Sequence, residues 1–184
     1  INTERPQGGV GFWIHNNIAD RTSIFEPNVK NNNILWLQIH GKTKTCFICI
    51  IYSRPHDINN HTTVMSTLTL NIKEIQPMGP TIITGDFNSH ITQLTEAQIK
   101  RGPSKYDKAL INLIEQTHLT PLSATEKDIK ENKHWTYHGY NNTHSVNDYI
   151  LTHNADNNPQ YYTVHQDINC GSTHRLITVR IDFQ

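Results

Sequence analysis

The stretch "TIITGDFNSH", residues 81 to 90, sets four strand-favouring residues before a glycine, an aspartate and an asparagine. In an extended chain neighbouring side chains point to opposite faces, so Asp86 and Asn88 project to one side while Phe87 turns to the other. Gly85 permits a backbone geometry or close approach that a side chain would obstruct. A carboxylate and a carboxamide therefore converge at a strand end, where α/β sheets commonly carry sites. An Asx-type turn after the strand is the plainer interpretation, and it stays open here.

The segments around this stretch alternate between strand and helix patterns. β-Branched and aromatic runs bounded by turn residues predict strands. These runs are residues 9–14, 34–39, 45–52, 80–84, 147–152, 161–165 and 176–183. Apolar residues at helical spacing predict one helix between His61 and Gln76 and a second that includes Tyr106 to Ile114. Strands that meet helices in both orders predict a layered α/β domain.

Length and composition limit the kind of protein. A chain of 184 residues has room for one domain with a proper core and little room for a second. Its 16 basic and 16 acidic residues give no global basic field, so a polyanionic partner must be held locally. Three cysteines fit a reducing, intracellular compartment, and no apolar run reaches the roughly 20 residues of a membrane span. Because the chain opens on Ile1 and soon reaches strand-like sequence, we expect the single domain 1–184 to be incomplete at its N-terminus.

Four motifs occur in a specific order along the chain: "IYSRP", "GDFN", "SVNDYIL" and "STHRLITVRI". In this order they resemble the endonuclease/exonuclease/phosphatase superfamily, and most closely the apurinic/apyrimidinic-like endonuclease domain of non-LTR retrotransposons. The stretches "GGVGFWI", "RGPSKYDKALINLIEQTHL" and "HWTYHG" support the resemblance, which runs from Gly8 to the end. It implies a layered α/β sandwich of two β-sheets flanked by helices, here without its first strands.

The resemblance implies a role for each matching residue. Asp86 would orient or deprotonate the attacking water, and Asn88 would hold that water or a phosphate oxygen. Tyr52 would lie against the scissile phosphate. His174 would donate to the phosphate, with Asp148 fixing the orientation of its ring. Phosphodiester hydrolysis needs an activated water on one side and hydrogen-bond donors on the other, and this set supplies both.

Substrate contacts are expected near the same loop. Lys100, Arg101 and Lys105 form the main basic cluster, suited to the phosphates of a bound strand, although a solvated loop would look the same. The resemblance adds Thr136 to these contacts. Rings that could stack on bases, or fill the core instead, are His90, Trp135 and Tyr137.

The resemblance implies Mg²⁺ as cofactor but leaves its site incomplete. The family supplies an asparagine and a glutamate ahead of the Gly-rich strand, and this chain starts after both. The family's final Ser-Asp-His reads Ser172, Thr173 and His174 here, so Thr173 replaces a family ligand. Asp86 is then the remaining, weak metal ligand. Because carboxylates hold Mg²⁺, we expect impaired cleavage.

Two other metal sites are conceivable and disfavoured. Cys46 and Cys49 lie in a strand-like run where residues three apart face opposite sides. His134, His138 and His144 do not fit one helix, and strand residues four apart are about 13 Å apart.

Three functions remain open. The first is a retrotransposon-type endonuclease domain that cuts duplex DNA in the nucleus, impaired in this form. The second is a small-molecule phosphoesterase of the same superfamily, and the third is a catalytically dead binding or structural remnant. A reverse-transcriptase segment following in the same frame would favour the first, and the sequence leaves the oligomeric state open.

Overall fold

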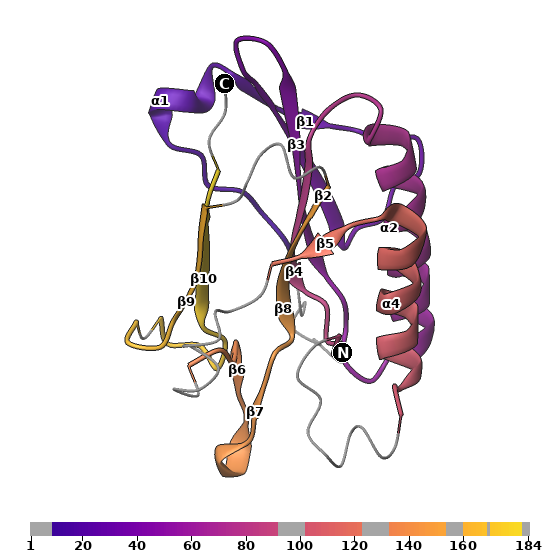
Figure 1. Ribbon diagram of the computed structural model, residues 1–184, viewed down its shortest axis with the longest axis vertical. Helices are drawn as coiled ribbons and strands as arrows, with labels where there is room; N and C mark the ends of the chain where they lie inside the picture. The colour runs from indigo at the N-terminus through magenta and orange to yellow at the C-terminus, as the bar shows by residue number, and fades with distance from the viewer. Residues whose placement is uncertain (1–8, 92–101, 123–132, 154–159, 169, 182–184) are drawn as a thin grey trace, which may run out of the picture.

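The computed structural model describes residues 9–91, 102–122, 133–153, 160–168 and 170–181. A central β-sheet carries two long helices on one face and small sheets on the other (Figure 1). The predicted layered α/β architecture, with two β-sheets and flanking helices, is confirmed. No helix among the described residues is both long and apolar enough to span a membrane.

The central sheet has the strand order β1–β2–β3–β4–β8–β5. Its strands are β1 (Thr22–Phe25), β2 (Ile34–His40), β3 (Thr45–Tyr52), β4 (Thr81–Asp86), β5 (Thr120–Pro121) and β8 (Asp148–His153). Strands β3 and β4 are parallel, and the other neighbours in this sheet are antiparallel. Parallel neighbours need a crossover, which α2 (Ile58–Ile75) provides.

The remaining elements are short, apart from one helix. They are α1 (Asn16–Ala19), α4 (Lys105–Thr117), β6 (Tyr137–His138), a 3-10 turn (Tyr140–Asn142), β7 (His144–Ser145), β9 (Gln160–His165) and β10 (Leu176–Arg180). β6 pairs with β7 and β9 pairs with β10, both antiparallel. An isolated antiparallel bridge between Tyr137 and His174 joins β6 to the segment that precedes β10.

Both long helices begin at a side-chain cap. The Asp57 carboxylate accepts a hydrogen bond from the Asn60 backbone N–H, so α2 begins three residues before the predicted His61. In α4 the Ser104 hydroxyl and the Asp107 carboxylate each accept from the other's backbone N–H, which forms a capping box. Each helix buries one stripe against the sheet, as its spacing predicts.

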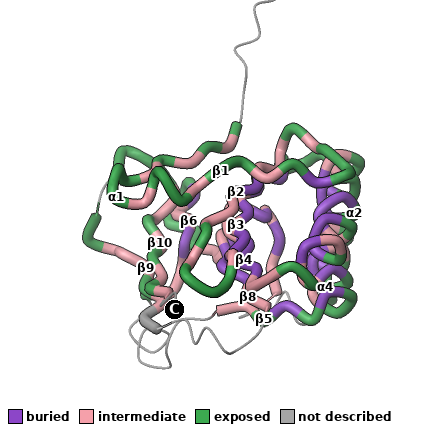
Figure 2. The backbone as a smooth tube through the Cα atoms, turned by 90° about the horizontal axis from the view of Figure 1, so that it is seen from above, coloured by how far each residue is buried: buried purple, intermediate pink, exposed green. Residues whose placement is uncertain are grey.

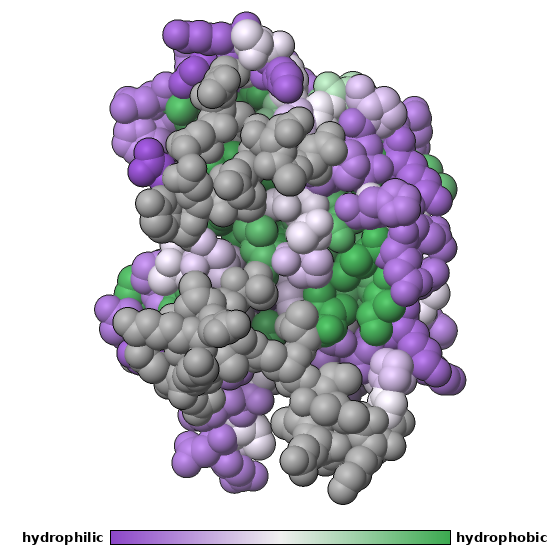
Figure 3. Space-filling view, viewed as in Figure 1, coloured by the Kyte–Doolittle hydropathy of each residue, from purple (hydrophilic) through white to green (hydrophobic). Residues whose placement is uncertain are grey.

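Two apolar clusters hold the layers together. The larger lies between the sheet and α2 and α4, and it includes Trp36, Phe47, Cys49, Ile51, Leu68, Ile72, Phe87 and Leu110. Figure 2 shows this buried zone beside the helices, and Figure 3 shows their hydrophilic outer side. The smaller cluster contains Cys46, Ile82 and Ile150, with Ile177 and Val179 packed on it. Cys46 and Cys49 therefore face opposite sides of the sheet, as predicted.

The segment 9–14 is a correction to the predicted strands. It contains no strand or helix, and its Trp13 side chain is fully exposed. A strand needs a hydrogen-bonded neighbour, and no strand in the described ranges pairs with this segment. Strand propensity alone therefore did not make a strand here.

Candidate active site

The end of β4 is shaped by a glycine. Gly85 has φ +139°, and a Cβ at this position would overlap the Ile51 carbonyl oxygen of the neighbouring strand. The close approach predicted at this glycine is therefore confirmed. It brings the last residues of β3 and β4 together, so that Tyr52 pairs with Asp86.

Asp86 and Asn88 form one hydrogen-bonded unit. The Asn88 backbone N–H donates to Asp86 Oδ1 at 2.9 Å, which is the Asx-type turn left open by the sequence. Asn88 Nδ2 donates to Asp86 Oδ2 and to the Ser53 carbonyl oxygen, each at 2.8 Å. Asn88 adopts φ +47°, a conformation that asparagine tolerates. Both amide hydrogens are engaged, so the Asn88 Oδ1 atom, without a partner among the described residues, remains to accept.

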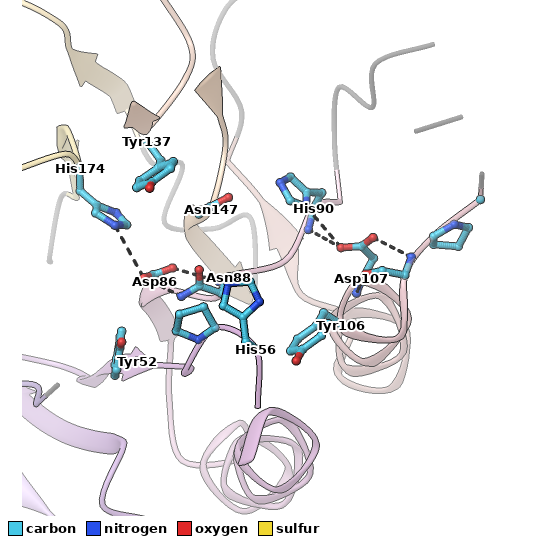
Figure 4. A pocket seen from close by; sticks show the side chains of 14 residues that line it. Tyr52, His56, Asp86, Asn88, His90, Tyr106, Asp107, Tyr137, Asn147 and His174 are labelled. Atoms are coloured by element: carbon cyan, nitrogen blue, oxygen red, sulfur yellow. Dashed lines mark hydrogen bonds and ion pairs between the residues drawn. The ribbon is translucent and has the colours of Figure 1, made fainter. Parts of the chain in front are cut away.

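A second pair, Asp148 and His174, faces this unit, and Figure 4 shows the His174 ring pointing toward Asp86. Asp148 opens β8 directly opposite Asp86 in the antiparallel register. His174 Nδ1 lies 3.0 Å from Asp148 Oδ2, and its Nε2 lies 3.9 Å from Asp86 Oδ2. The ring thus stands between two carboxylates from neighbouring strands. Its backbone is held by the bridge to Tyr137, whose ring meets the imidazole edge-on at 5.0 Å.

The pKa of Asp86 and the pKa of His174 are both raised in this cluster. Burial, and then the charge of Asp148, raise the pKa of Asp86 to about 6, although Asn88 and His174 oppose the shift. The hydrogen bond to Asp148 raises the pKa of His174 above its ordinary value, against the effect of burial. A raised pKa favours the imidazolium, which offsets the repulsion between the two carboxylates.

A cleft of about 800 Å³ opens above these groups. Four of the predicted catalytic residues line it, namely Tyr52, Asp86, Asn88 and His174. Asp148 reaches it through the His174 ring. His90 and Tyr137, two of the rings that could stack on bases, also line the cleft. Lining residues without a predicted catalytic or substrate-binding role include His56, Tyr106, Asp107 and Asn147. His56 follows "IYSRP", so its closeness to a strand end was the available signal.

Neither Thr136 nor Lys105, two of the predicted substrate contacts, lines the cleft. Thr136 is fully buried, and its hydroxyl accepts from the backbone N–H groups of Asn147 and Asp148. This corrects its prediction as a substrate contact, because a hydroxyl used in this way orients the start of β8. Lys105 is exposed and lines a separate groove between α2 and α4. Lys100 and Arg101 lie outside the described residues.

The other predicted aromatic and histidine residues form a stack around the β6–β7 hairpin. The Trp135 and His144 rings stack with centroids 4.2 Å apart, and the Arg175 guanidinium lies 4.7 Å from the Trp135 ring centroid. His138 lies opposite His144 in the hairpin. Trp135 therefore packs on this hairpin.

The donor chemistry of the cleft fits a loosely held Mg²⁺. In the described ranges no three His, Cys, Asp or Glu side chains are grouped to bind a metal ion. Each Asp86 oxygen accepts one hydrogen bond and keeps a second lone pair, and Asn88 Oδ1 is open. Mg²⁺ commonly uses one or two carboxylates together with waters and substrate phosphates. Thr173 is exposed and does not line the cleft, while its carbonyl accepts from the His138 N–H.

The buried His61 ring ties the end of β3 to both long helices. Its Nε2 lies 3.1 Å from the Tyr106 carbonyl oxygen, and its Nδ1 lies 2.6 Å from the Ser53 hydroxyl. A carbonyl only accepts, so Nε2 carries the proton and Ser53 donates to Nδ1. The Ser53 carbonyl accepts from Asn88, and His61 therefore supports the backbone that positions Asn88.

We expect His61 to make the stability of the fold depend on pH. Burial lowers the pKa of His61, although the hydrogen bond to Tyr106 and the charge of Asp107 oppose this shift. The unfolded chain, where histidine titrates near 6.5, therefore takes up the proton first. Stability from the neutral ring is complete above that pH and is lost as the pH falls through the lower folded-state pKa.

Urea unfolding of the unmodified chain and of His61→Gln at pH 7, 6 and 5 measures this effect. All other histidines are shared, so the difference in unfolding free energy isolates position 61. Glutamine reproduces the two hydrogen bonds imperfectly and should cost about 1–2 kcal/mol at pH 7. The difference in unfolding free energy between the two proteins should become smaller as the pH falls. A gap that is constant or that widens would contradict the expectation.

Comparison with known proteins identifies the family. Residues 46–178 match the family described as endonuclease-reverse transcriptase. The chain belongs to this family. The endonuclease domain of TRAS1, a telomere-specific non-LTR retrotransposon, has the same fold with a TM-score of 0.68 at 16% identity. That match covers 90% of this chain and 71% of the TRAS1 domain.

A second solved structure shares the fold of this endonuclease-reverse transcriptase chain. A variant of the 3′ phosphatase NExo from Neisseria, bound to a product DNA hairpin, matches with a TM-score of 0.61 at 14% identity. The match covers 88% of this chain and 70% of NExo. A comparison with curated protein sequences finds no match. The predicted resemblance to the endonuclease/exonuclease/phosphatase superfamily is confirmed, and it supports a nuclease-like phosphoesterase function.

Proposed function

We propose that this chain hydrolyses phosphodiester bonds of duplex DNA in the nucleus, as a retrotransposon-type endonuclease domain. One observation carries the proposal. The Asp86–Asn88 unit and the His174–Asp148 pair face each other in one cleft, His174 Nε2 lying 3.9 Å from Asp86 Oδ2. The base Asp86 and the amide of Asn88, which can hold a water, thus lie opposite His174, a hydrogen-bond donor for phosphate oxygens. In-line displacement requires this arrangement.

Asp86 and Asn88 act on the water. The pKa of Asp86, raised to about 6, makes this carboxylate a stronger base than an ordinary aspartate while it stays mainly ionised at pH 7. Asn88 Oδ1 is free to accept from the same water, because both hydrogens on Nδ2 are held by Asp86 and Ser53. The water is therefore oriented before it attacks.

His174 and Tyr52 act on the phosphate. Asp148 accepts from His174 Nδ1 and raises the pKa of the ring, which favours the imidazolium form that also carries a proton on Nε2, toward the cleft. An imidazolium there stabilises the charge that develops on the phosphate oxygens. Tyr52, at the end of β3, lines the same cleft and contributes its hydroxyl. Mg²⁺, held by Asp86 with Asn88, would supply further charge neutralisation when bound.

The proposal predicts Mg²⁺-dependent nicking of supercoiled plasmid by the purified chain. We expect a low rate, because Asp86 is the one carboxylate that lines this part of the cleft among the described residues, and His174 already lies close to it. Asp148→Asn, purified in the same way, should lower the rate at least about 10-fold, because the His174 ring loses the carboxylate that orients it. EDTA should abolish the nicking.

Two other substrates separate the competing functions. A hairpin with a 3′-phosphate tests phosphatase activity, and an inositol phosphate tests the small-molecule phosphoesterase. Hydrolysis of either in preference to plasmid contradicts the endonuclease. If the folded chain cuts none of the three at any Mg²⁺ concentration, the catalytically dead binding module replaces the enzyme.

A further inference from the structure

The cleft extends beyond the catalytic groups into a second part, which we call the outer lobe. Its walls are Pro55, His56, His90, Pro103, Ser104 and Tyr106. They come from the loop after β3, the segment after β4 and the start of α4. None of these side chains has a role in the hydrolysis derived above.

Among the described residues, the outer lobe offers hydrogen-bond donors and little exposed negative charge. The one carboxylate among its described lining residues, Asp107, is buried and already engaged. Asp107 Oδ1 accepts from the His90 backbone N–H at 2.7 Å, and Oδ2 accepts from the Ser104 N–H at 2.8 Å. Two imidazoles and a phenol line the lobe instead, from His56, His90 and Tyr106. This chemistry suits an anion, in contrast to the neighbouring Asp86 and Asp148 carboxylates.

The His90 ring lies beside Asp107. The His90 Nδ1 atom lies 3.5 Å from the same Asp107 Oδ1 that holds its backbone (Figure 4). About a third of the His90 side chain is exposed, whereas the Asp107 side chain is 8% exposed. With its backbone held by Asp107 and Nδ1 facing the same carboxylate, the ring leaves Nε2 for a ligand. The arrangement repeats the carboxylate and imidazole pair of Asp148 and His174 on another wall of the same cleft.

We propose that the outer lobe binds a phosphate next to the scissile one in a bound DNA strand, with His90 as the contacting residue and Asp107 as its positioning residue. The proposal rests on the proposed function, because a strand whose scissile phosphate lies at His174 continues along the same cleft. A second phosphate contact fixes the register of the strand without reading its bases.

The test compares the affinities of the unmodified chain and of variants for short oligonucleotides. It is done in EDTA, so that no catalysis is needed. The ligands are the trinucleotide TpTpT and two analogues in which one or the other linkage is a neutral methylphosphonate, and NMR titration gives each Kd. The unmodified chain should bind TpTpT about 10-fold more tightly than at least one analogue, the scale of one charge-assisted hydrogen bond. In His90→Ala that advantage should shrink to less than about 2-fold, because the coupling between residue and phosphate is lost.

Two further variants control the result. His40→Ala removes an exposed histidine at the opposite end of the sheet, where β2 ends as β3 begins, and it should keep the full advantage. Asp107→Asn should lose it as His90→Ala does, and its unfolding free energy, measured separately, shows whether the α4 cap has also weakened. His90→Ala keeps the backbone N–H that binds Asp107, so it should fold.

The outcomes separate the outer lobe from the proposed function. If TpTpT shifts the His174 signals but His90→Ala keeps the full advantage, the outer-lobe proposal fails and the nuclease proposal stands. If TpTpT shifts neither His174 nor His90 signals at millimolar concentrations, both fail.

Discussion

Replacing Gly85 with alanine should destabilise the fold by several kcal/mol. The new Cβ would overlap the carbonyl oxygen of Ile51 and come within 2.9 Å of that residue's backbone carbon and nitrogen. Ile51 is itself buried in a central strand, so its backbone cannot move aside without breaking the pairing of β3 with β4. Gly85 also has φ +139°, which an L-residue rarely adopts.

The expected loss is several kcal/mol. Overpacking a core costs about 1–3 kcal/mol, and a sparsely populated backbone conformation costs about 1–3 kcal/mol more. Domains of this size are stable by only about 5–15 kcal/mol. Urea or thermal unfolding followed by circular dichroism measures the loss.

Two other glycines provide matched controls. A Cβ at Gly102 meets no atom within 4 Å but its φ is +68°, so Gly102→Ala should cost about 1 kcal/mol. Gly11 has open space and no positive φ, and Gly11→Ala should change little. The predicted order of destabilisation is therefore position 85, then 102, then 11. A Gly85→Ala protein that unfolds within about 1 kcal/mol of the parent would refute this account of the strand end.

The sequence predicted the elements whose signal is local. β3 matches the predicted residues 45–52, because an unbroken β-branched and aromatic run suits a strand buried on both faces. α2 and α4 follow from apolar spacing. The two-residue strands β5, β6 and β7 escaped prediction, because each is defined by the partner it meets and has too few residues to show a period.

The candidate site was predictable where residues lie at strand ends. Asp86 and Asn88 were readable from one short stretch, but β4 ends at Asp86, and the Asx-type turn left open by the sequence, not strand alternation, joins the two residues. The approach of His174 to Asp148 came only with the resemblance, because 26 residues separate them in sequence. Thr136 shows the limit of such motifs. It was assigned to substrate, but its hydroxyl accepts two backbone hydrogen bonds inside the fold.

His174→Ala and Asp86→Asn should each lower the plasmid-nicking rate about 10²- to 10³-fold. For His174 this is the usual scale for removing one transition-state donor, about 2.7–4 kcal/mol, and for Asp86 it lies within the roughly 10²- to 10⁴-fold contribution of a general base. Alanine at 174 removes the imidazolium that faces the phosphate and leaves Asp148 without its partner. Asparagine at 86 removes the base, and its amide nitrogen would face one of the two donors of Asn88. His40→Ala, far from the cleft, should retain the parent rate.

The double variant tells whether the two residues act as one unit. His174 Nε2 lies 3.9 Å from Asp86 Oδ2, so both contact the same reacting phosphate and water, and the loss of either disables the other. The double variant should therefore be at most about 10-fold slower than the worse single variant, well short of the roughly 10⁴- to 10⁶-fold product of independent effects. Single-turnover nicking with enzyme in excess measures all four proteins. Losses that multiply in full would show that Asp86 and His174 act on separate steps, and the shared cleft would then need another explanation.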